Sequence, residues 1–266
     1  MMMLRALAFG LLIYPLQAQW VSYPTANVPR TKDGKPDLGA ACPRTADGHP
    51  DLTGLWIMPP THAPNPDFPG CEAIADEFAN IAVSLKGGLP YQPWAADLVK
   101  TRRGEKRVND PMSHCAPIGP IRLYSWNGPK KFVQSAGLLI ILNELATSYR
   151  QIFTDGRPLP VDPTPSWNGY SSGKWEGDTL VVQTSGFRDG IWLDAAGNPM
   201  TDAAKIIERF RRKDFGHMEV EVTVDDPKAY TKPWTVTLHQ VIKLDTDLID
   251  FACGDNEKDA SHLSSK

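Results

Sequence analysis

The stretch His217-Met-Glu-Val-Glu-Val-Thr-Val224 decides the fold class of this chain. Apolar side chains occupy every second position from Met218 to Val224, and the residues between them are polar. Because successive side chains of a β-strand point to opposite faces, this pattern predicts a strand with one dry and one wet face. The segment therefore indicates a sheet that covers a core on one side only.

Further strand patterns lie on both sides of this segment, separated by short turn sequences. They cover residues 52–57, 132–134, 138–142, 148–154, 171–175, 179–184, 205–212, 234–242 and 248–253. Helical spacing is confined to residues 72–103, with one run over 72–86 and a second that begins at Pro93. Sequential hairpins predict an antiparallel sheet, and closure of that sheet removes its exposed edges. We expect a mainly β protein, either an up-and-down barrel or a strongly curved sheet, with a two-sheet sandwich as the alternative.

The N-terminal part predicts export and an extended arm. Arg5, an apolar run over 6–14 and the tripeptide Leu16-Gln-Ala18 have the pattern of a secretory signal peptide over residues 1–18. Residues 19–70 are expected to form an arm, and 71–266 a single β-rich domain whose strands lie mainly over 131–253. We expect a periplasmic or extracellular protein without a membrane-spanning segment after signal removal. The host's membrane number and the oligomeric state stay open.

Composition narrows the function only slightly. The formal charge of −3 gives no basic footprint, so no nucleic-acid partner is expected. The cysteines at 42, 71, 115 and 253 form no CxxC pair, and export permits disulfides. We expect structural disulfides, with Cys115–Cys253 as the first choice, and buried free thiols as the alternative.

The arm contains an internal duplication. Pro29-Arg-Thr-Lys-Asp-Gly-Lys-Pro-Asp-Leu38 recurs as Pro43-Arg-Thr-Ala-Asp-Gly-His-Pro-Asp-Leu52. Asp-Gly and Pro-Asp favour turns, so each copy is expected to be a looped, extended unit. The aspartates do not follow the spacing of an EF-hand loop, whose last ligand is a glutamate.

Three phrases of the chain resemble a known family. They are Pro43-Arg-Thr-Ala-Asp-Gly-His-Pro-Asp-Leu-Thr-Gly-Leu-Trp56, Arg150-Gln-Ile-Phe-Thr-Asp-Gly-Arg-Pro158 and Gly173-Lys-Trp-Glu-Gly-Asp-Thr-Leu-Val-Val182. Together they resemble uncharacterised secreted proteins of soil bacteria, notably acidobacteria, over residues 43 to 263. The resemblance implies export and a lipocalin-like β fold, with no established activity. Those relatives carry Gly-His-Pro-His-Ser-Glu where this chain has Gly197-Asn-Pro-Met-Thr-Asp202.

The strongest polar cluster combines Arg150, Asp155, Arg157, Glu208 and Arg209. Glu208 shares a strand face with two apolar residues, so we expect it to point inward. A buried carboxylate has a raised pKa and can act as a general acid or base, while an arginine holds an anionic substrate. A structural salt-bridge network is the alternative.

Three other residues are candidates for a ligand site. His239 lies mid-strand and is either a pocket acid or base or an ordinary sheet histidine. Trp167 and Trp192 lie near turns and either stack on a flat ligand or plug the core. No HExxH, GxGxxG or phosphate-loop sequence is present, so no metal and no cofactor are predicted.

Three functions remain open from sequence. The first is a β-barrel that binds a small amphipathic or carbohydrate-like ligand, with Arg157, Asp155, Trp167, Trp192 and Arg209 as binding residues. The second is an extracytoplasmic lyase, isomerase or hydrolase with Glu208, Arg150 and His239 as catalytic residues. The third is an envelope interaction module that docks through the arm. Whether the protein is an enzyme stays open.

Overall fold

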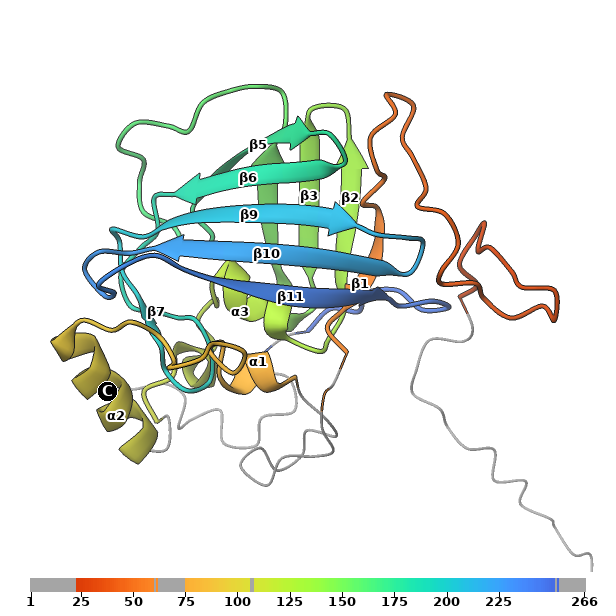
Figure 1. Ribbon diagram of the computed structural model, residues 1–266. Helices are drawn as coiled ribbons and strands as arrows, with labels where there is room; N and C mark the ends of the chain where they lie inside the picture. Colours follow the sequence, from red (N-terminus) through yellow and green to blue (C-terminus); the bar gives the residue numbers. More distant parts are fainter. Residues whose placement is uncertain (1–22, 60, 62–74, 106–107, 252, 254–266) are drawn as a thin grey trace, which may run out of the picture.

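The computed structural model describes residues 23–59, 61, 75–105, 108–251 and 253 (Figure 1). The predicted signal peptide over 1–18 and Cys71 lie outside these residues. The helices are α1 Asp76–Ala79, α2 Pro93–Gly104 and α3 Pro120–Ser125, with 3-10 turns Pro111–His114 and Leu145–Thr147. The strands are β1 Gly54–Ile57, β2 Lys130–Ser135, β3 Leu138–Asn143, β4 Ser148–Phe153, β5 Tyr170–Glu176, β6 Thr179–Ser185, β7 Ile191–Trp192, β8 Pro199–Met200, β9 Lys205–Arg212, β10 His217–Asp225 and β11 Trp234–Ile242.

In the described part of the chain, nine strands close into a barrel in the order β1-β11-β10-β9-β6-β5-β4-β3-β2 (Figure 1). The mainly β barrel predicted from sequence is confirmed. Most neighbours are antiparallel, as the alternation predicts, and β7 pairs with β8 in a separate ribbon. One pair departs from the up-and-down pattern, because β4 and β5 run parallel.

The parallel pair follows from the connection between the two strands. The loop over 154–169 contains Pro158, Pro160, Pro163 and Pro165, which cannot donate to a sheet ladder. It carries the chain back before β5 begins, so β5 overlaps β4 only at its end. The register joins Ile152 to Ser171 and Phe153 to Ser172, and no further. The first half of β4 therefore has no strand partner on this side.

Aromatic side chains fill the middle of the barrel. Trp56, Phe132 and Phe210 are fully buried, and the rings of Phe132 and Phe210 meet edge to face with centroids 6.0 Å apart. The short helix α3 is buried along its whole length and packs against β11, where Gln240 Nε2 donates to the Tyr124 carbonyl at 3.0 Å. The described middle of the barrel is thus a packed core of side chains.

Two predicted elements differ from the structure. The helical pattern over 72–86 yields only α1 among its described residues, because the next groups bond elsewhere: the Ile81 amide donates to buried Asp194 at 2.7 Å. The strand predicted over 248–253 is absent from its described residues, where the Ile249 amide instead donates to Glu144 at 3.2 Å. By contrast, α2 begins at Pro93 as predicted.

The predicted Cys115–Cys253 disulfide is confirmed, with Cα atoms 5.7 Å apart. It ties the end of the described chain to the turn that precedes α3. Cys42 is a free thiol. Within the described residues, no helix combines the length and apolar character needed to cross a membrane.

Replacing both cysteines, Cys115→Ser with Cys253→Ser, should lower the free energy of unfolding by about 2–4 kcal/mol, because the unfolded chain regains the entropy of a long open loop. Urea unfolding followed by circular dichroism measures the change. Reducing agent should produce the same loss in the wild type, and Cys42→Ser should not. An unchanged midpoint in the double variant would contradict the bridge.

A second prediction concerns Lys130, which is buried at the start of β2. Its Nζ donates to the Trp126 carbonyl at 2.9 Å and to Gln240 Oε1 at 3.1 Å. Burial lowers the pKa of this amine to about 7. Between pH 7 and the ordinary lysine pKa, the unfolded state therefore binds a proton that the folded state has lost, and stability rises with pH.

The wild type should gain stability relative to Lys130→Met as pH rises from 7 to 9, by up to about 1.4 kcal/mol per pH unit. Urea midpoints of both proteins across this range give the difference. A difference that stays flat would show that the folded-state amine keeps an ordinary pKa.

Candidate functional site

A buried ion pair between Arg150 of β4 and Glu208 of β9 lies inside the barrel. Arg150 is 3% exposed and Glu208 is fully buried. The contact is bidentate: Arg150 Nη1 donates to Glu208 Oε1 at 2.7 Å, and Nη2 donates to Oε2. Fork-to-fork geometry of this kind is the strongest arrangement for a guanidinium and a carboxylate.

Hydroxyl groups complete the shell around the pair. Arg150 Nε donates to Ser171 Oγ of β5 at 3.1 Å, and Nη2 donates to Thr184 Oγ1 of β6 at 2.7 Å. Tyr124 of α3 accepts a bond from Nη1. Thr184 Oγ1 in turn donates to Glu208 Oε2 at 3.3 Å. Every nitrogen of the guanidinium and both carboxylate oxygens are therefore engaged.

The surroundings keep the Arg150 guanidinium charged and the Tyr124 phenol neutral. Burial alone would lower the pKa of Arg150, but the Glu208 carboxylate outweighs burial and the net pKa is raised. Burial raises the pKa of Tyr124 well above its ordinary value, so its phenol stays protonated. The contacts form a compensated ion pair, which matches the salt-bridge alternative considered from sequence.

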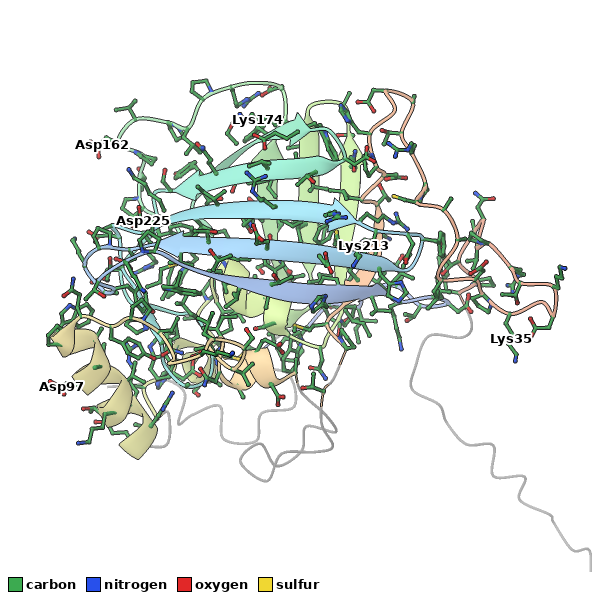
Figure 2. All side chains as sticks on the ribbon, in the orientation of Figure 1. Lys35, Asp97, Asp162, Lys174, Lys213 and Asp225 are labelled. Carbon is green, nitrogen blue, oxygen red and sulfur yellow. A yellow bond between two sulfur atoms is a disulfide. The ribbon has the colours of Figure 1, made fainter. Side chains whose placement is uncertain are left out.

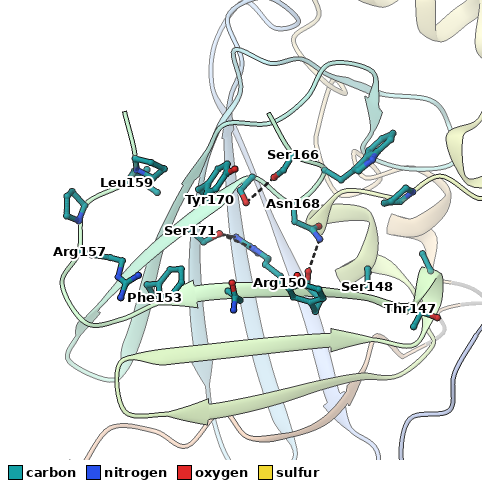
Figure 3. A pocket seen from close by; sticks show the side chains of 18 residues that line it. Thr147, Ser148, Arg150, Phe153, Arg157, Leu159, Ser166, Asn168, Tyr170 and Ser171 are labelled. Atoms are coloured by element: carbon teal, nitrogen blue, oxygen red, sulfur yellow. Dashed lines mark hydrogen bonds between the residues drawn. The ribbon is translucent and has the colours of Figure 1, made fainter. Parts of the chain in front are cut away.

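A cavity of about 650 Å³, the wall cavity, opens where β4 lacks a strand partner (Figure 3). Its walls are the outward face of β4 and the loop that leads to β5, and Arg150 and Ser171 form part of its lining. Asn168 bridges the gap, because its Nδ2 donates to the Tyr149 carbonyl at 3.0 Å. Because Arg150 and Ser171 belong to both the lining and the buried network, the wall cavity adjoins that network.

The lining of the wall cavity is rich in rings. Tyr149, Phe153, Trp167 and Tyr170 all contribute, and Tyr149 is 64% exposed. Asn168 adds a polar group of a special kind: its Oδ1 is buried and has no hydrogen-bond partner among the described residues. An unpaired buried acceptor costs about 1–3 kcal/mol, and Asn168 Oδ1 is shielded from solvent in this structure.

The loop that forms the outer wall is held in place. The Ser166 amide donates to the Gly186 carbonyl at 3.0 Å, and the Arg188 amide donates to the Ser166 carbonyl at the same distance. Tyr170 Oη donates to the Thr164 carbonyl at 2.9 Å. The Arg188 guanidinium also lies over the Trp167 ring, 4.5 Å from its centroid. These bonds shape the wall cavity without a ligand.

Several residues predicted from sequence meet at this place. Glu208 and Arg150 form the buried pair, and Trp167 and Arg157 line the wall cavity. Arg157 also lies over the Phe153 ring at 3.9 Å and bonds Asp155, with Nη2 of Arg157 on Asp155 Oδ2 at 2.6 Å. Five of the predicted residues thus share one region of the barrel.

Three predicted residues lie elsewhere. His239 is exposed on the outer face of β11, 3.7 Å from Glu219, whereas Glu208 points inward, so the two do not form one site. Arg209 is also on the outer face, 3.2 Å from Glu176. Trp192 is buried in β7 beneath the Arg102 guanidinium, so its alternative reading as a core residue fits its position.

Sequence reasoning missed Tyr124, Tyr149 and Asn168 as site residues. The alternation of β4 already placed Tyr149 on the face opposite Arg150, so a cavity on the outer face could have been considered. Tyr124 and Asn168 lie in a short helix and a proline-rich loop that carry no periodic signal.

Within the described residues, no three histidine, cysteine, aspartate or glutamate side chains converge as a metal site would require. Comparison of the chain with protein-family models, curated proteins and solved structures finds no match.

Glu208→Gln should destabilise the fold by about 3–5 kcal/mol, since it leaves the buried Arg150 charge without a counter-ion. Urea unfolding measures the loss. Glu221→Gln is the matched control on the outer face of β10. The exposed Glu221 carboxylate lies as far as 4.0 Å from Arg209, so its loss should change stability by less than about 1 kcal/mol. Equal effects of the two substitutions would contradict the buried pair.

Proposed function

We propose that the protein binds a small, uncharged amphipathic molecule in the wall cavity. The volume of about 650 Å³ supports this, because small-molecule sites commonly measure about 300–1,000 Å³. The mix of several aromatic rings with few polar groups is typical of such sites. A held outer loop lowers the entropy lost on binding.

The polar groups of the wall cavity suggest the ligand's chemistry. Arg150 is neutralised by Glu208 and Arg157 by Asp155, so the lining offers no uncompensated charge among the described residues. A flat apolar part would lie against Tyr149 and the neighbouring rings. The aromatic rings that line a cavity of this volume are the observation that carries the proposal.

We assign no reaction to the pair of Glu208 and Arg150. Both carboxylate oxygens are held by Arg150, and Glu208 does not belong to the lining of the wall cavity. A general acid or base needs reach to a substrate proton. Export to the periplasm or the exterior is part of the proposal, supported by the signal sequence and the Cys115–Cys253 bridge.

The test titrates the protein with 2-naphthol and with 2-methoxynaphthalene, which has the same ring but no donor, and follows ligand fluorescence. Both ligands should bind with similar affinity, because each places the same ring system against the aromatic lining. Tyr149→Ala should weaken 2-naphthol binding about tenfold through loss of ring contact.

Tyr23→Ala is the matched control, an exposed tyrosine of the arm that does not line the wall cavity. It should leave binding unchanged. Native mass spectrometry of the protein from its own secretome should reveal a retained neutral ligand that Tyr149→Ala loses. Binding that both tyrosine variants leave unaltered would remove the wall cavity as the site.

A further inference from the structure

The two sequence repeats of the arm fold into the same loop. In repeat 1, residues 29–38, the Gly34 amide donates to the Thr31 carbonyl at 2.9 Å and the Asp37 amide donates to Pro29 at 2.8 Å. Repeat 2, residues 43–52, reproduces these bonds at equivalent positions, at 3.0 and 2.9 Å. Each repeat also has an isolated bridge between its arginine and its second proline. The two repeats are therefore similar in structure as well as in sequence.

Repeat 2 has a receptor within the molecule, namely the turn between β5 and β6. Arg44 forms a bidentate pair with Asp178, with Nη1 to Oδ1 at 2.8 Å and Nη2 to Oδ2 at 2.7 Å. His49 stacks on Trp175 with ring centroids 4.6 Å apart and planes inclined by 6°. The bond from Arg44 lowers the pKa of Asp178. The repeat thus recognises a tight hairpin through one carboxylate and one aromatic ring.

In repeat 1, Arg30 and Lys35 occupy the positions of Arg44 and His49, and both are exposed to solvent. Arg30 Nη1 donates to the Gly34 carbonyl at 2.7 Å, just as Arg44 Nη1 donates to Gly48 at 2.8 Å. Among the described residues, the Arg30 guanidinium has no acidic partner. Lys35, at the position of His49, is exposed at the outer end of the arm and lies 3.3 Å from Asp33 of its own loop (Figure 2).

Repeat 1 is nevertheless held against the barrel at both ends. Before the loop, the Thr25 amide donates to Asp245 Oδ1 at 3.0 Å. After it, the Gly216 amide donates to the Leu38 carbonyl and the Phe215 amide to Ala40, both at 2.8 Å. The barrel therefore presents the loop in a fixed place, which reduces the entropy lost when a partner docks.

The two repeats differ in charge. Repeat 1 carries Lys32 and Lys35 where repeat 2 carries Ala46 and His49. We therefore expect a hairpin turn that binds repeat 1 to carry more negative charge than the turn at Asp178. The side-chain stem of Lys35 can cover an aromatic ring as His49 covers Trp175, with a cation–π contribution.

We propose that repeat 1 is a docking site for an acidic β-hairpin turn of another protein, with a tryptophan three residues before an aspartate as in Trp175-Glu-Gly-Asp178. The occupied copy supplies the recognition geometry: Arg30 pairs with the aspartate and Lys35 covers the ring. A second copy of this chain is not the partner, since its own turn is already covered by repeat 2.

The probe is a backbone-cyclised peptide of residues 172–181, which keeps Trp175 and Asp178 on one closed hairpin. It is labelled and titrated with the full chain, and fluorescence anisotropy gives the dissociation constant. We expect saturable binding that weakens as salt rises. Arg30→Ala with Lys35→Ala should weaken it about tenfold, through the loss of two exposed contacts.

Lys35→Glu leaves the hydrogen bond from Arg30 to the Gly34 carbonyl in place and should also weaken binding. Weaker binding by this variant therefore does not come from the loss of that loop bond. Lys100→Ala removes a cation from the exposed face of α2 and should have no effect. A control peptide with Trp175→Ala and Asp178→Asn should not bind. Circular dichroism confirms the fold of each variant.

Absence of peptide binding, or binding that the repeat 1 variants do not alter, would overturn the proposal. Sedimentation of the wild type tests the choice of partner, and we expect a monomer. Dimers that Arg30→Ala with Lys35→Ala dissolves would make a second copy the partner and overturn the assignment to a different protein.

Discussion

The buried pair of Arg150 and Glu208 is the contact on which the rest of the structure depends. It joins β4 to β9 through the barrel interior, and the hydroxyls of Tyr124, Ser171 and Thr184 bring α3, β5 and β6 into the same network. Two charges in a dry interior are tolerated only when each is paired and its remaining hydrogen-bonding groups are satisfied. The pair therefore ties together elements whose backbone ladders alone would leave the barrel weakly closed between β4 and β5.

The weak closure between β4 and β5 also creates the wall cavity. A parallel pair of two residues leaves half of β4 without a ladder partner, and the proline-rich loop over 154–169 covers that half without filling it. Arg150, one member of the pair that closes the barrel, thus also lines the wall cavity. Aromatic side chains pack the described middle of the barrel, and the proposed binding site therefore lies in the wall.

Much of this architecture could be predicted from sequence, because strand alternation is a local signal. The strands β9, β10 and β11 and the inward direction of Glu208 follow from it. The start of α2 at Pro93 follows from the preference of proline for the first helical turn. The outward position of His239 was also available, since Trp234, Val236 and Leu238 form the apolar face of its strand. The parallel pairing of β4 and β5 was not available, because a loop without periodicity does not say where its ends meet. The partners of Arg150 come from distant segments for the same reason, and Asn168 belongs to that loop.

The most direct test of the central claim is chemical-shift mapping of the ¹⁵N-labelled protein with 2-naphthol. If the wall cavity is the binding site, the perturbed amides are those of β4, from Tyr149 to Phe153, and of the facing residues 166–171. Perturbations centred on the interior around Trp56, Phe132 and Phe210, or none at saturating ligand, would contradict the account. Perturbation of β4 and residues 166–171 would identify the wall cavity beside the Arg150–Glu208 pair as the ligand-binding site.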